Sequence, residues 1–339
     1  MKILNIMLSR DLGGIQQAFL DYNNAFKLQD VEVINVTSLF AKINNKLLAN
    51  FKLLNLGPWD IISSLYLKLL IKIIKPNAII AHGNRAINFA KNNNITLVGV
   101  AHNYSIKWLK KCDYVIALTN HMKEYLILQN FNEAKICVIP NMISIKKKPL
   151  NKKYRNPVVI GTIARFVEKK GIDVFIESLS KLKKLQYSFK AVIGGDGVEK
   201  NNLINLTKNL GLEKDLSFTG WVKNKDKFFE DVDIFCIPSL HEPFGIIALE
   251  AMEHSLPIVA SRSEGLSEII RNEQDGLLCR IGSSDDLAKN LASLINDEEQ
   301  AHNFASSAYL RLIENYDIKV LSLDLTNFIR TFCKGLSIK

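Results

Sequence analysis

The sequence lacks several features that would assign it to a large protein class. No apolar run reaches the about 20 residues of a membrane-spanning helix, because the most apolar stretch, residues 61–74, is interrupted by Lys68 and Lys72. The apolar start, residues 1–8, is too short for a signal peptide. With 47% hydrophobic and 23% charged residues, the composition excludes a disordered or low-complexity chain. The length of 339 residues favours two domains.

Cysteine is scarce and scattered. The five cysteines run from Cys112 to Cys333, and none forms a CxxC pair. A disulfide framework or a structural zinc site needs closer, paired spacing, so both are excluded. We expect most of the cysteines to be small apolar core residues in a reducing compartment, and we place the protein in the cytoplasm.

Arginine is also scarce, and the basic charge is uneven. Only 9 of the 44 basic residues are arginine; residues 1–150 hold 19 Lys/Arg against 8 Asp/Glu, and residues 151–339 hold 25 against 26. Such asymmetry suggests that the first half meets an anionic partner: nucleic acid, an anionic membrane surface or an acidic lipid-linked substrate. Little arginine and the lack of a nucleic-acid-binding motif disfavour nucleic acid. An AT-rich genome, which enriches Lys, Asn and Ile, is the alternative without function.

Short apolar runs alternate with helical patterns along the whole chain. Several runs are continuously apolar, which is typical of strands buried on both faces of a parallel sheet. Two series of such strands predict two doubly wound, Rossmann-like α/β domains. The expected strands are residues 2–8, 31–36, 78–81, 96–101, 114–118 and 136–139, then 158–163, 190–193, 216–218, 234–237, 257–260 and 276–278.

A polar, basic segment that contains two prolines separates the two series. We interpret this segment, residues 144–157, as a linker between an N-terminal domain, residues 1–143, and a C-terminal domain, residues 158–315. A helical segment, residues 316–339, is expected to pack back towards the N-terminal domain. Ligands of open α/β sheets bind beyond the carboxyl ends of the strands, so we expect the active cleft between the domains.

The most informative segment is HEPFGIIALEAM, residues 241–252. We expect a helix over residues 244–252, with Glu242 at its entrance, where free N–H groups favour a phosphate. Glu250 lies eight positions later, about 12 Å along a helix. An unpaired carboxylate in an apolar helix is costly, so a ribose diol is a suitable partner. The alternative is that Glu242 is a first-turn dipole residue and Glu250 a structural ion-pair partner.

A second segment, GTIARFVEKKG at residues 161–171, ends a strand and precedes an expected helix over residues 172–185. Arg165 and Lys170 would project from the carboxyl edge of the sheet and form a clamp for a diphosphate. The alternative is a solvated basic loop, which we prefer for Lys169.

Together the two segments resemble the retaining glycosyltransferases of family 4, which have the GT-B fold. The resemblance is strong over residues 158–281 and diffuse before residue 140. Further segments that resemble the family are residues 192–197 (VIGGDG), 218–222 (FTGWV), 257–265 (PIVASRSEG) with 268–270, 139–141 (IPN), 13–16 (GGIQ) and 101–103 (AHN). The turn at 194–197 lacks the full GxGxxG, which disfavours a dinucleotide oxidoreductase.

The resemblance implies a role for each matching residue. Arg165 and Lys170 would bind the diphosphate of a nucleotide-sugar donor. Glu250 would bind the ribose hydroxyls, and Glu242 would contact the transferred sugar. Remaining contacts would come from the backbone N–H groups of Phe244, Gly245 and Ile246, from Gly14 and Val222 on the donor, and from His102 on the sugar or the acceptor.

The expected activity is retaining transfer of a sugar from a nucleotide-diphosphate sugar to a glycan or lipid-linked acceptor. The resemblance suggests bacterial lipopolysaccharide, capsule or cell-envelope polysaccharide synthesis. We assign no DxD motif to a metal, and the cationic clamp makes one unnecessary, so we expect no cofactor. The alternatives are an epimerase or phosphorylase on the same fold, or a non-catalytic nucleotide-sugar-binding module.

Other histidines carry weaker expectations. His82 and Arg85 would line the acceptor side or only cap a surface loop. His241 is a cleft candidate because it adjoins Glu242. His121 and His254 are expected to be structural or exposed.

A membrane contact is the last expectation. Residues 59–75 predict a helix with lysines along one stripe and apolar residues around the rest, as in an interfacial helix. The alternative is a helix whose apolar face packs on the N-terminal sheet and whose lysines point into water. We expect peripheral binding to the anionic inner face of the cytoplasmic membrane.

Overall fold

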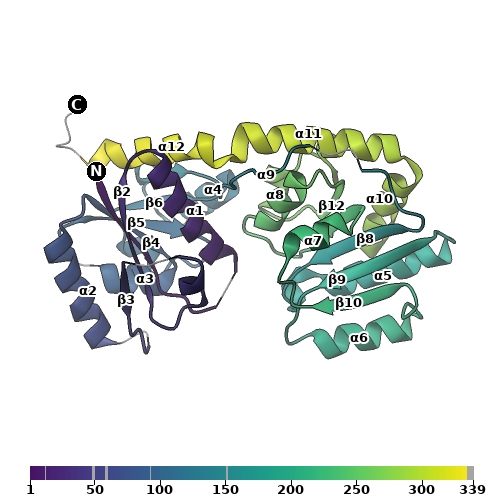
Figure 1. The fold of residues 1–339 in the computed structure, drawn as a ribbon, viewed down its shortest axis with the longest axis horizontal. Helices are drawn as coiled ribbons and strands as arrows, with labels where there is room; N and C mark the ends of the chain where they lie inside the picture. The colour runs from purple at the N-terminus through teal and green to yellow at the C-terminus, as the bar shows by residue number, and fades with distance from the viewer. Residues whose placement is uncertain (12, 48–49, 58–59, 92, 150–151, 334–339) are drawn as a thin grey trace. The chain divides into compact units, whose positions relative to one another are not determined.

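A computed structural model describes residues 1–11, 13–47, 50–57, 60–91, 93–149 and 152–333. The chain divides into two compact units, Met1–Ser144 with Asn315–Lys339, and Ile145–Glu314. Each unit is a parallel sheet with helices packed on it (Figure 1), which confirms the predicted pair of doubly wound domains. The expected linker, residues 144–157, falls largely within the second unit. Residues 150–151 of that linker and residues 334–339 of the expected C-terminal segment lie outside the described residues.

The sheet of the first unit has seven strands in the order β3-β2-β1-β4-β5-β6-β7, and every neighbouring pair is parallel. The sequence predicted all of them except β3, which is only three residues long and has no pattern of its own. The strands are β1 (Lys2–Met7), β2 (Glu32–Ser38), β3 (Phe51–Leu53), β4 (Ala78–His82), β5 (Thr96–Ala101), β6 (Tyr114–Ala117) and β7 (Ile136–Val138).

The helices of the first unit come from both ends of the chain. Gln29 donates a hydrogen bond to Ser322 Oγ at 3.0 Å, and Tyr114 stacks on Phe332 with ring centroids 4.2 Å apart. The C-terminal helix α12 therefore completes this unit. Its helices are α1 (Gly14–Leu28), α2 (Ile61–Ile74), α3 (Asn84–Ala90), α4 (Asn120–Leu128) and α12 (Ile318–Phe332), with short 3-10 turns η1 (Lys42–Asn45), η2 (Leu109–Lys111) and η3 (Glu133–Lys135).

The second unit repeats the design with six parallel strands in the order β10-β9-β8-β11-β12-β13. The strands are β8 (Val158–Ile163), β9 (Phe189–Gly194), β10 (Leu216–Gly220), β11 (Ile234–Ile237), β12 (Ile258–Ser261) and β13 (Leu277–Cys279). The helices are α5 (Ile172–Lys184), α6 (Lys200–Asn209), α7 (Lys225–Glu230), α8 (Ile246–Glu253), α9 (Leu266–Ile269), α10 (Ser284–Asn296) and α11 (Glu298–Tyr316), with the 3-10 turn η4 (Glu168–Lys170).

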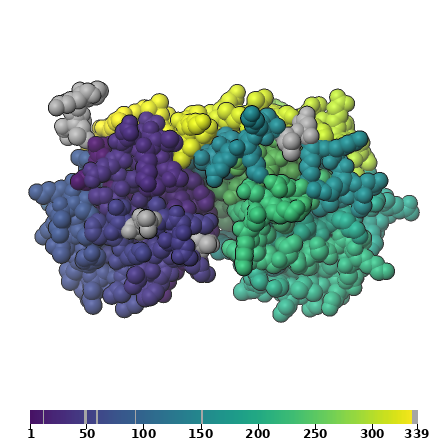
Figure 2. All heavy atoms as spheres, viewed as in Figure 1, coloured from purple at the N-terminus to yellow at the C-terminus, as the bar shows by residue number. Residues whose placement is uncertain are grey.

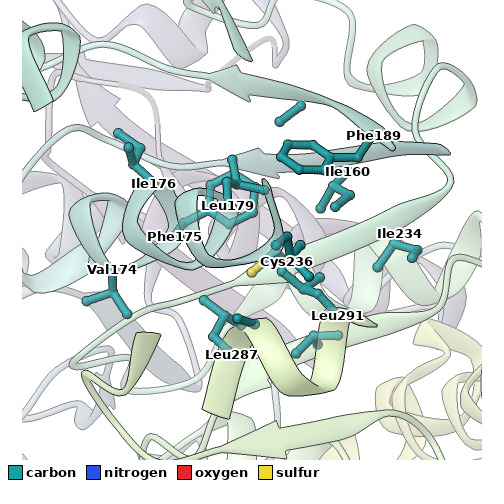
Figure 3. Packing of buried hydrophobic residues seen from close by; sticks show 14 of the residues in the cluster. Ile160, Val174, Phe175, Ile176, Leu179, Phe189, Ile234, Cys236, Leu287 and Leu291 are labelled. Carbon is teal, nitrogen blue, oxygen red and sulfur yellow. The ribbon is translucent and has the colours of Figure 1, made fainter. Parts of the chain in front are cut away.

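The core of the second unit fixes the site-bearing loops. Phe175 and Leu179 of α5 pack with Cys236 of β11 and with Leu287 and Leu291 of α10 (Figure 3), and all five are fully buried. Because β8 and β11 are neighbours in the sheet, the loops that leave their carboxyl ends emerge next to each other. This edge holds most of the residues that the sequence singled out.

The cysteines match their expectation only in part. The structure describes all five, and all are free thiols. Cys236 and Cys279 are buried, as predicted, whereas Cys112, Cys137 and Cys333 are half-buried.

Helix α2 exposes the residues that it was expected to bury. Asp60 caps it by accepting a hydrogen bond from Ser63 N at 2.9 Å; Trp59, the expected start, lies outside the described residues. The buried residues form a narrow stripe of Ser63, Leu67, Leu70 and Ile71. Six large apolar side chains are between 42% and 72% exposed: Ile61, Ile62, Leu65, Tyr66, Leu69 and Ile73. The alternative in which this face packs on the sheet is therefore wrong.

Candidate functional site

Two loops of the second unit are fastened together at the carboxyl edge of the sheet. The β11–α8 loop donates backbone hydrogen bonds from Leu240 and His241 to the carbonyl of Lys169 in the β8–α5 loop, at 2.9 and 3.2 Å. Gly171 has a φ of 60°, and a Cβ there would lie 2.2 Å from the carbonyl oxygen of Pro238. Only glycine allows the two loops to approach this closely.

The fastened loops bring Lys170 and Glu242 into a hydrogen-bonded ion pair. Their side chains are only 17% and 13% exposed, so each charge depends on the other for its neutralisation. The sequence assigned these residues to the same ligand without predicting that they contact each other. A ligand that binds Lys170 through a phosphate therefore has to compete with, or share, the Glu242 carboxylate.

Arg165 lies on the same loop and is exposed. Among the described residues, its guanidinium makes no hydrogen bond or ion pair. An arginine of this kind can bind an incoming phosphate in a bidentate manner without first breaking a contact.

Glu264 is a member of this site that the sequence analysis did not single out. Its carboxylate is 2.5 Å from His241 Nδ1 and accepts a hydrogen bond from the Glu242 backbone N–H at 3.2 Å. Burial alone would raise the pKa of Glu264, but these hydrogen bonds hold it below its usual range. The only sequence signal was its position in the family-like segment 257–265. His241, the cleft candidate, thus adjoins the pair as expected.

Helix α8 starts later than predicted. Gly245 is its N-cap with a φ of 109°, so Phe244 precedes the helix and Glu242 lies four residues before Ile246 rather than at the helix entrance. A Cβ on Gly245 would lie 2.7 Å from Leu266 Cδ2, and a Cβ on Gly265 would lie 2.3 Å from the carbonyl oxygen of Phe244. The first turn of a helix presents N–H groups without intrahelical partners. Its start is therefore suited to an anion.

Glu250 has a partner in the structure. Lys225 Nζ donates to both of its carboxylate oxygens at 2.7 Å, and the Glu250 side chain is 17% exposed. This geometry matches the alternative of a structural ion pair, although the 46% exposed Lys225 can move aside for a ribose. His254 bonds the Glu250 carbonyl and Asp226, at 2.8 and 2.9 Å, which is the structural role expected of it.

The glycine turn 194–197 contacts the Arg165 loop. Added Cβ atoms would lie 1.9 Å from the Ala164 carbonyl oxygen at Gly195 and 2.4 Å from the Phe166 carbonyl oxygen at Gly197. A Cβ on Gly194 would meet Val222, a predicted donor contact, at 2.4 Å. These glycines allow protein backbone to approach backbone, so a dinucleotide is not needed to explain them.

The sequence does contain one Asp-x-Asp triplet, residues 231–233, which requires a correction. Asp233 is buried and accepts hydrogen bonds from Arg155 Nη1 at 2.7 Å and from Val159 N at 2.8 Å, while Asp231 is 2.8 Å from Lys227. The triplet precedes β11 and so lies at the amino edge of the sheet, opposite the paired loops. In the described parts of the chain, no three His, Cys, Asp or Glu residues gather as a metal site.

The first unit places two histidines side by side. His82 ends β4 and His102 follows β5, and their Nδ1 and Nε2 atoms are 3.0 Å apart. Burial lowers the pKa of His102 to about 4. Arg85 donates to Asn55 Oδ1 at 3.2 Å, and Gly14 is the first residue of α1. The roles of these residues towards an acceptor or donor stay predictions.

Comparison with known proteins agrees with this arrangement. Residues 144–311 match the family model of Glycosyl transferases group 1, and residues 29–147 match that of Glycosyltransferase Family 4. A lipopolysaccharide core biosynthesis glycosyltransferase, LpsE, of Rhizobium meliloti is 27% identical over 59% of this chain and 56% of its own length. A poly(ribitol-phosphate) alpha-N-acetylglucosaminyltransferase of Staphylococcus aureus is 29% identical over 63% of this chain and 43% of its own length.

The chain thus spans about half the length of these curated relatives. A solved structure of Anabaena HepE, in complex with UDP and glucose, superposes with a TM-score of 0.85 at 20% identity, over 98% of this chain and 100% of HepE. That similarity shows the GT-B fold. The two family models together cover residues 29–311, well over half of the chain, and the chain therefore belongs to the GT-B superfamily of glycosyltransferases.

Proposed function

We propose that the protein transfers a sugar from a nucleotide-diphosphate sugar to a glycan or lipid-linked acceptor in bacterial envelope polysaccharide synthesis, with retention of anomeric configuration. The observation that carries the proposal is the Lys170–Glu242 pair, set beside Arg165 and the start of α8 on one sheet edge. LpsE, which acts in lipopolysaccharide core biosynthesis, and HepE, which binds UDP and glucose, support it.

The chemistry follows from the charges at this edge. As the bond from the sugar to the diphosphate breaks, negative charge builds on the leaving diphosphate. Arg165, Lys170 and the first N–H groups of α8 are the groups that would stabilise that charge. Lys170 then shifts from Glu242 towards the phosphate, and the released carboxylate is free to accept a hydrogen bond from a sugar hydroxyl.

Retention needs a route that avoids inversion. The Glu242 carboxylate already accepts the Lys170 ammonium, and Glu250 is bound by Lys225, so neither is free to act as a covalent nucleophile. We therefore propose a same-face, ion-pair-like transfer in which the donor phosphate takes the acceptor proton. We also propose that no divalent metal takes part, because the cationic groups supply the neutralisation that a metal would give.

The test combines binding and product analysis. A thermal-shift screen of UDP-, GDP- and ADP-sugars should find one donor that stabilises the fold, since a ligand at 100 times its Kd adds about 2.7 kcal/mol. NMR of the product formed with an acceptor should then show the anomeric configuration of the donor. An inverted product contradicts retention, and conversion of the donor without an acceptor to an isomeric nucleotide sugar favours the epimerase instead.

We further propose that α2 attaches the protein reversibly to an anionic membrane. Its exposed apolar side chains, Ile62, Leu65 and Leu69 among them, lie on one face of the helix, beside the exposed Lys68 and Lys72. The corresponding blue surface of the first unit is open to solvent in Figure 2. A helix of 14 residues is about 21 Å long, which suits a position in the plane of the interface. Within the described ranges, no helix has the length and apolar character needed to cross a membrane.

Vesicle co-sedimentation tests the membrane contact. Binding to vesicles with anionic lipid should fall when Leu65→Gln and Leu69→Gln are combined, because both side chains are more than half exposed and their loss leaves the fold intact. The matched control is Leu128→Gln on α4, which is 78% exposed outside this surface. Binding should also weaken at 1 M salt, where the Debye length is about 3 Å. Equal binding of all three proteins, or association of α2 with a second copy in light scattering, contradicts the membrane.

A further inference from the structure

A chain of hydrogen-bonded side chains runs through the interior of the first unit and ends at His102. His102 Nε2 is 3.0 Å from His82 Nδ1, and His82 Nε2 is 3.1 Å from Asn5 Oδ1. Asn5 Nδ2 is 3.1 Å from Asn35 Oδ1, and Asn35 Nδ2 is 2.8 Å from Asn23 Oδ1. His82 and the three asparagines are each at most 3% exposed. We call these five residues the polar relay.

The sheet explains why the relay exists. Asn5 on β1 lies directly opposite Asn35 on β2 in the parallel register, and His82 is at the end of the neighbouring strand β4. Phe19 and Tyr22 of α1 cover the His82 ring edge-on, with centroids 5.6 and 4.8 Å away. A polar group in such surroundings must be hydrogen-bonded, so every member of the relay needs a defined donor or acceptor role.

A backbone carbonyl sets the direction of the relay. Asn5 Nδ2 also faces the carbonyl oxygen of Phe19, at 3.4 Å. A carbonyl oxygen can only accept, so the Asn5 amide must turn its N–H groups towards Phe19 and Asn35. Its Oδ1 then faces His82 and needs a proton from His82 Nε2.

The direction passes from one imidazole to the next. Burial holds the pKa of His82 well below its ordinary value, so its ring is neutral and carries only one N–H. With that proton on Nε2, His82 Nδ1 is bare and accepts from His102 Nε2–H. His102 is neutral for the same reason, which leaves its Nδ1 without a proton.

We propose that the polar relay fixes His102 as a hydrogen-bond acceptor, with a bare Nδ1 that receives a hydroxyl proton of the bound sugar or acceptor. Asn5 and His82 act as positioning residues, since they contact the ligand only through His102. The role towards the ligand rests on the proposed glycosyl transfer, whereas the protonation pattern does not. The half-buried His102 is the relay member from which a ligand can be reached.

Nitrogen NMR of the ligand-free protein, labelled with [¹⁵N]histidine, tests the pattern directly. A hydrogen bond between two imidazoles gives a ¹⁵N–¹⁵N coupling across it, and we expect this coupling between His102 Nε2, which carries the proton, and His82 Nδ1. A proton on His82 Nδ1, or no coupling between the two rings, overturns the proposal. His121, which bonds Tyr104 instead, is the internal control and should show no such coupling.

The variant Asn5→Asp reverses the relay. A carboxylate beside His82 Nε2 favours the imidazolium, which then donates from Nδ1 to His102 Nε2 and moves the His102 proton to Nδ1. We expect the coupling to persist with the proton on His82, and kcat/KM to fall at least tenfold although His102 is unchanged. Asn141→Asp is the matched control because Asn141 is also a 3% exposed asparagine of the first unit and lies outside the relay.

The outcomes separate the two parts of the proposal. The expected coupling in a protein without transferase activity refutes the proposed function and leaves the relay intact. The expected coupling with full activity in Asn5→Asp refutes the role of His102 as an acceptor. If Asn5→Asp fails to fold, the wild-type spectrum still decides the direction of the relay, and His102→Phe, which should lower kcat/KM at least tenfold, decides the ligand role.

Discussion

The Lys170–Glu242 ion pair predicts different outcomes for stability and for donor binding. Lys170→Met leaves the Glu242 carboxylate, 13% exposed, without its ammonium partner. Removing one member of a fully buried pair costs about 3–5 kcal/mol, and we expect about 2–3 kcal/mol of unfolding free energy here because both side chains retain some solvent contact. Adding Glu242→Gln removes the unpaired charge, so the double variant should regain most of that stability.

Donor binding should not recover in the same way. Lys170 is proposed to bind the diphosphate, and a charge-assisted hydrogen bond contributes about 1.5–3 kcal/mol, or roughly tenfold to more than a hundredfold in affinity. The double variant regains its fold but not this contact, so its Kd for the nucleotide sugar should stay as weak as that of Lys170→Met.

Urea denaturation and titration calorimetry measure the two quantities. Lys169→Met is the matched control, because Lys169 is exposed on the same loop and should change neither. Wild-type donor affinity in Lys170→Met, or affinity restored in the double variant, would refute the assignment of Lys170 to the diphosphate.

Four further outcomes are expected. Glu250→Ala should impair donor binding tenfold or more in calorimetry while the protein stays folded, whereas Lys225→Met should leave it equal or tighter, since Lys225 competes with the ribose for the same carboxylate. Transfer activity should survive excess EDTA; abolition with rescue by Mg²⁺ or Mn²⁺ contradicts the metal-free mechanism. Gly245→Ala should lower the unfolding free energy by about 1–3 kcal/mol, because its φ is 109° and a Cβ would clash with a neighbouring leucine. The pKa of His102 is about 4 against about 6.5 when unfolded, so the unfolded chain binds more protons between these values; urea midpoints should therefore fall as the pH drops from 7 to 4, and less steeply in His102→Gln.

The strands and the donor loops were predictable because each has a local signal. Continuous apolar runs marked every strand except β3, whose three residues are too few for a pattern. The segments around Arg165 and Glu250 were recognisable by residue type and spacing. Their position at one sheet edge followed from the rule that loops after parallel strands share an edge.

Contacts between distant segments were not predictable in the same way. The pairing of Lys170 with Glu242 spans 72 positions, and the partner Glu264 has no pattern of its own. The start of α8 was missed because the φ of Gly245 depends on its packing against Leu266, which sequence spacing does not reveal. Helix α2 was ambiguous because an apolar face reads the same in the sequence whether it meets a sheet or solvent.

The position of α12 has a consequence for how the chain is made. The first unit contains Met1–Ser144 but also needs α12, which follows the whole of the second unit in the sequence. On the ribosome, the first sheet emerges early and must wait, with the surface of α1 that receives Gln29–Ser322 contacts uncovered, until about 170 further residues have been translated. The second unit is continuous in sequence and can fold as soon as it emerges. The nascent chain is therefore expected to complete its units in reverse order, and the uncovered surface of α1 is where a chaperone would act.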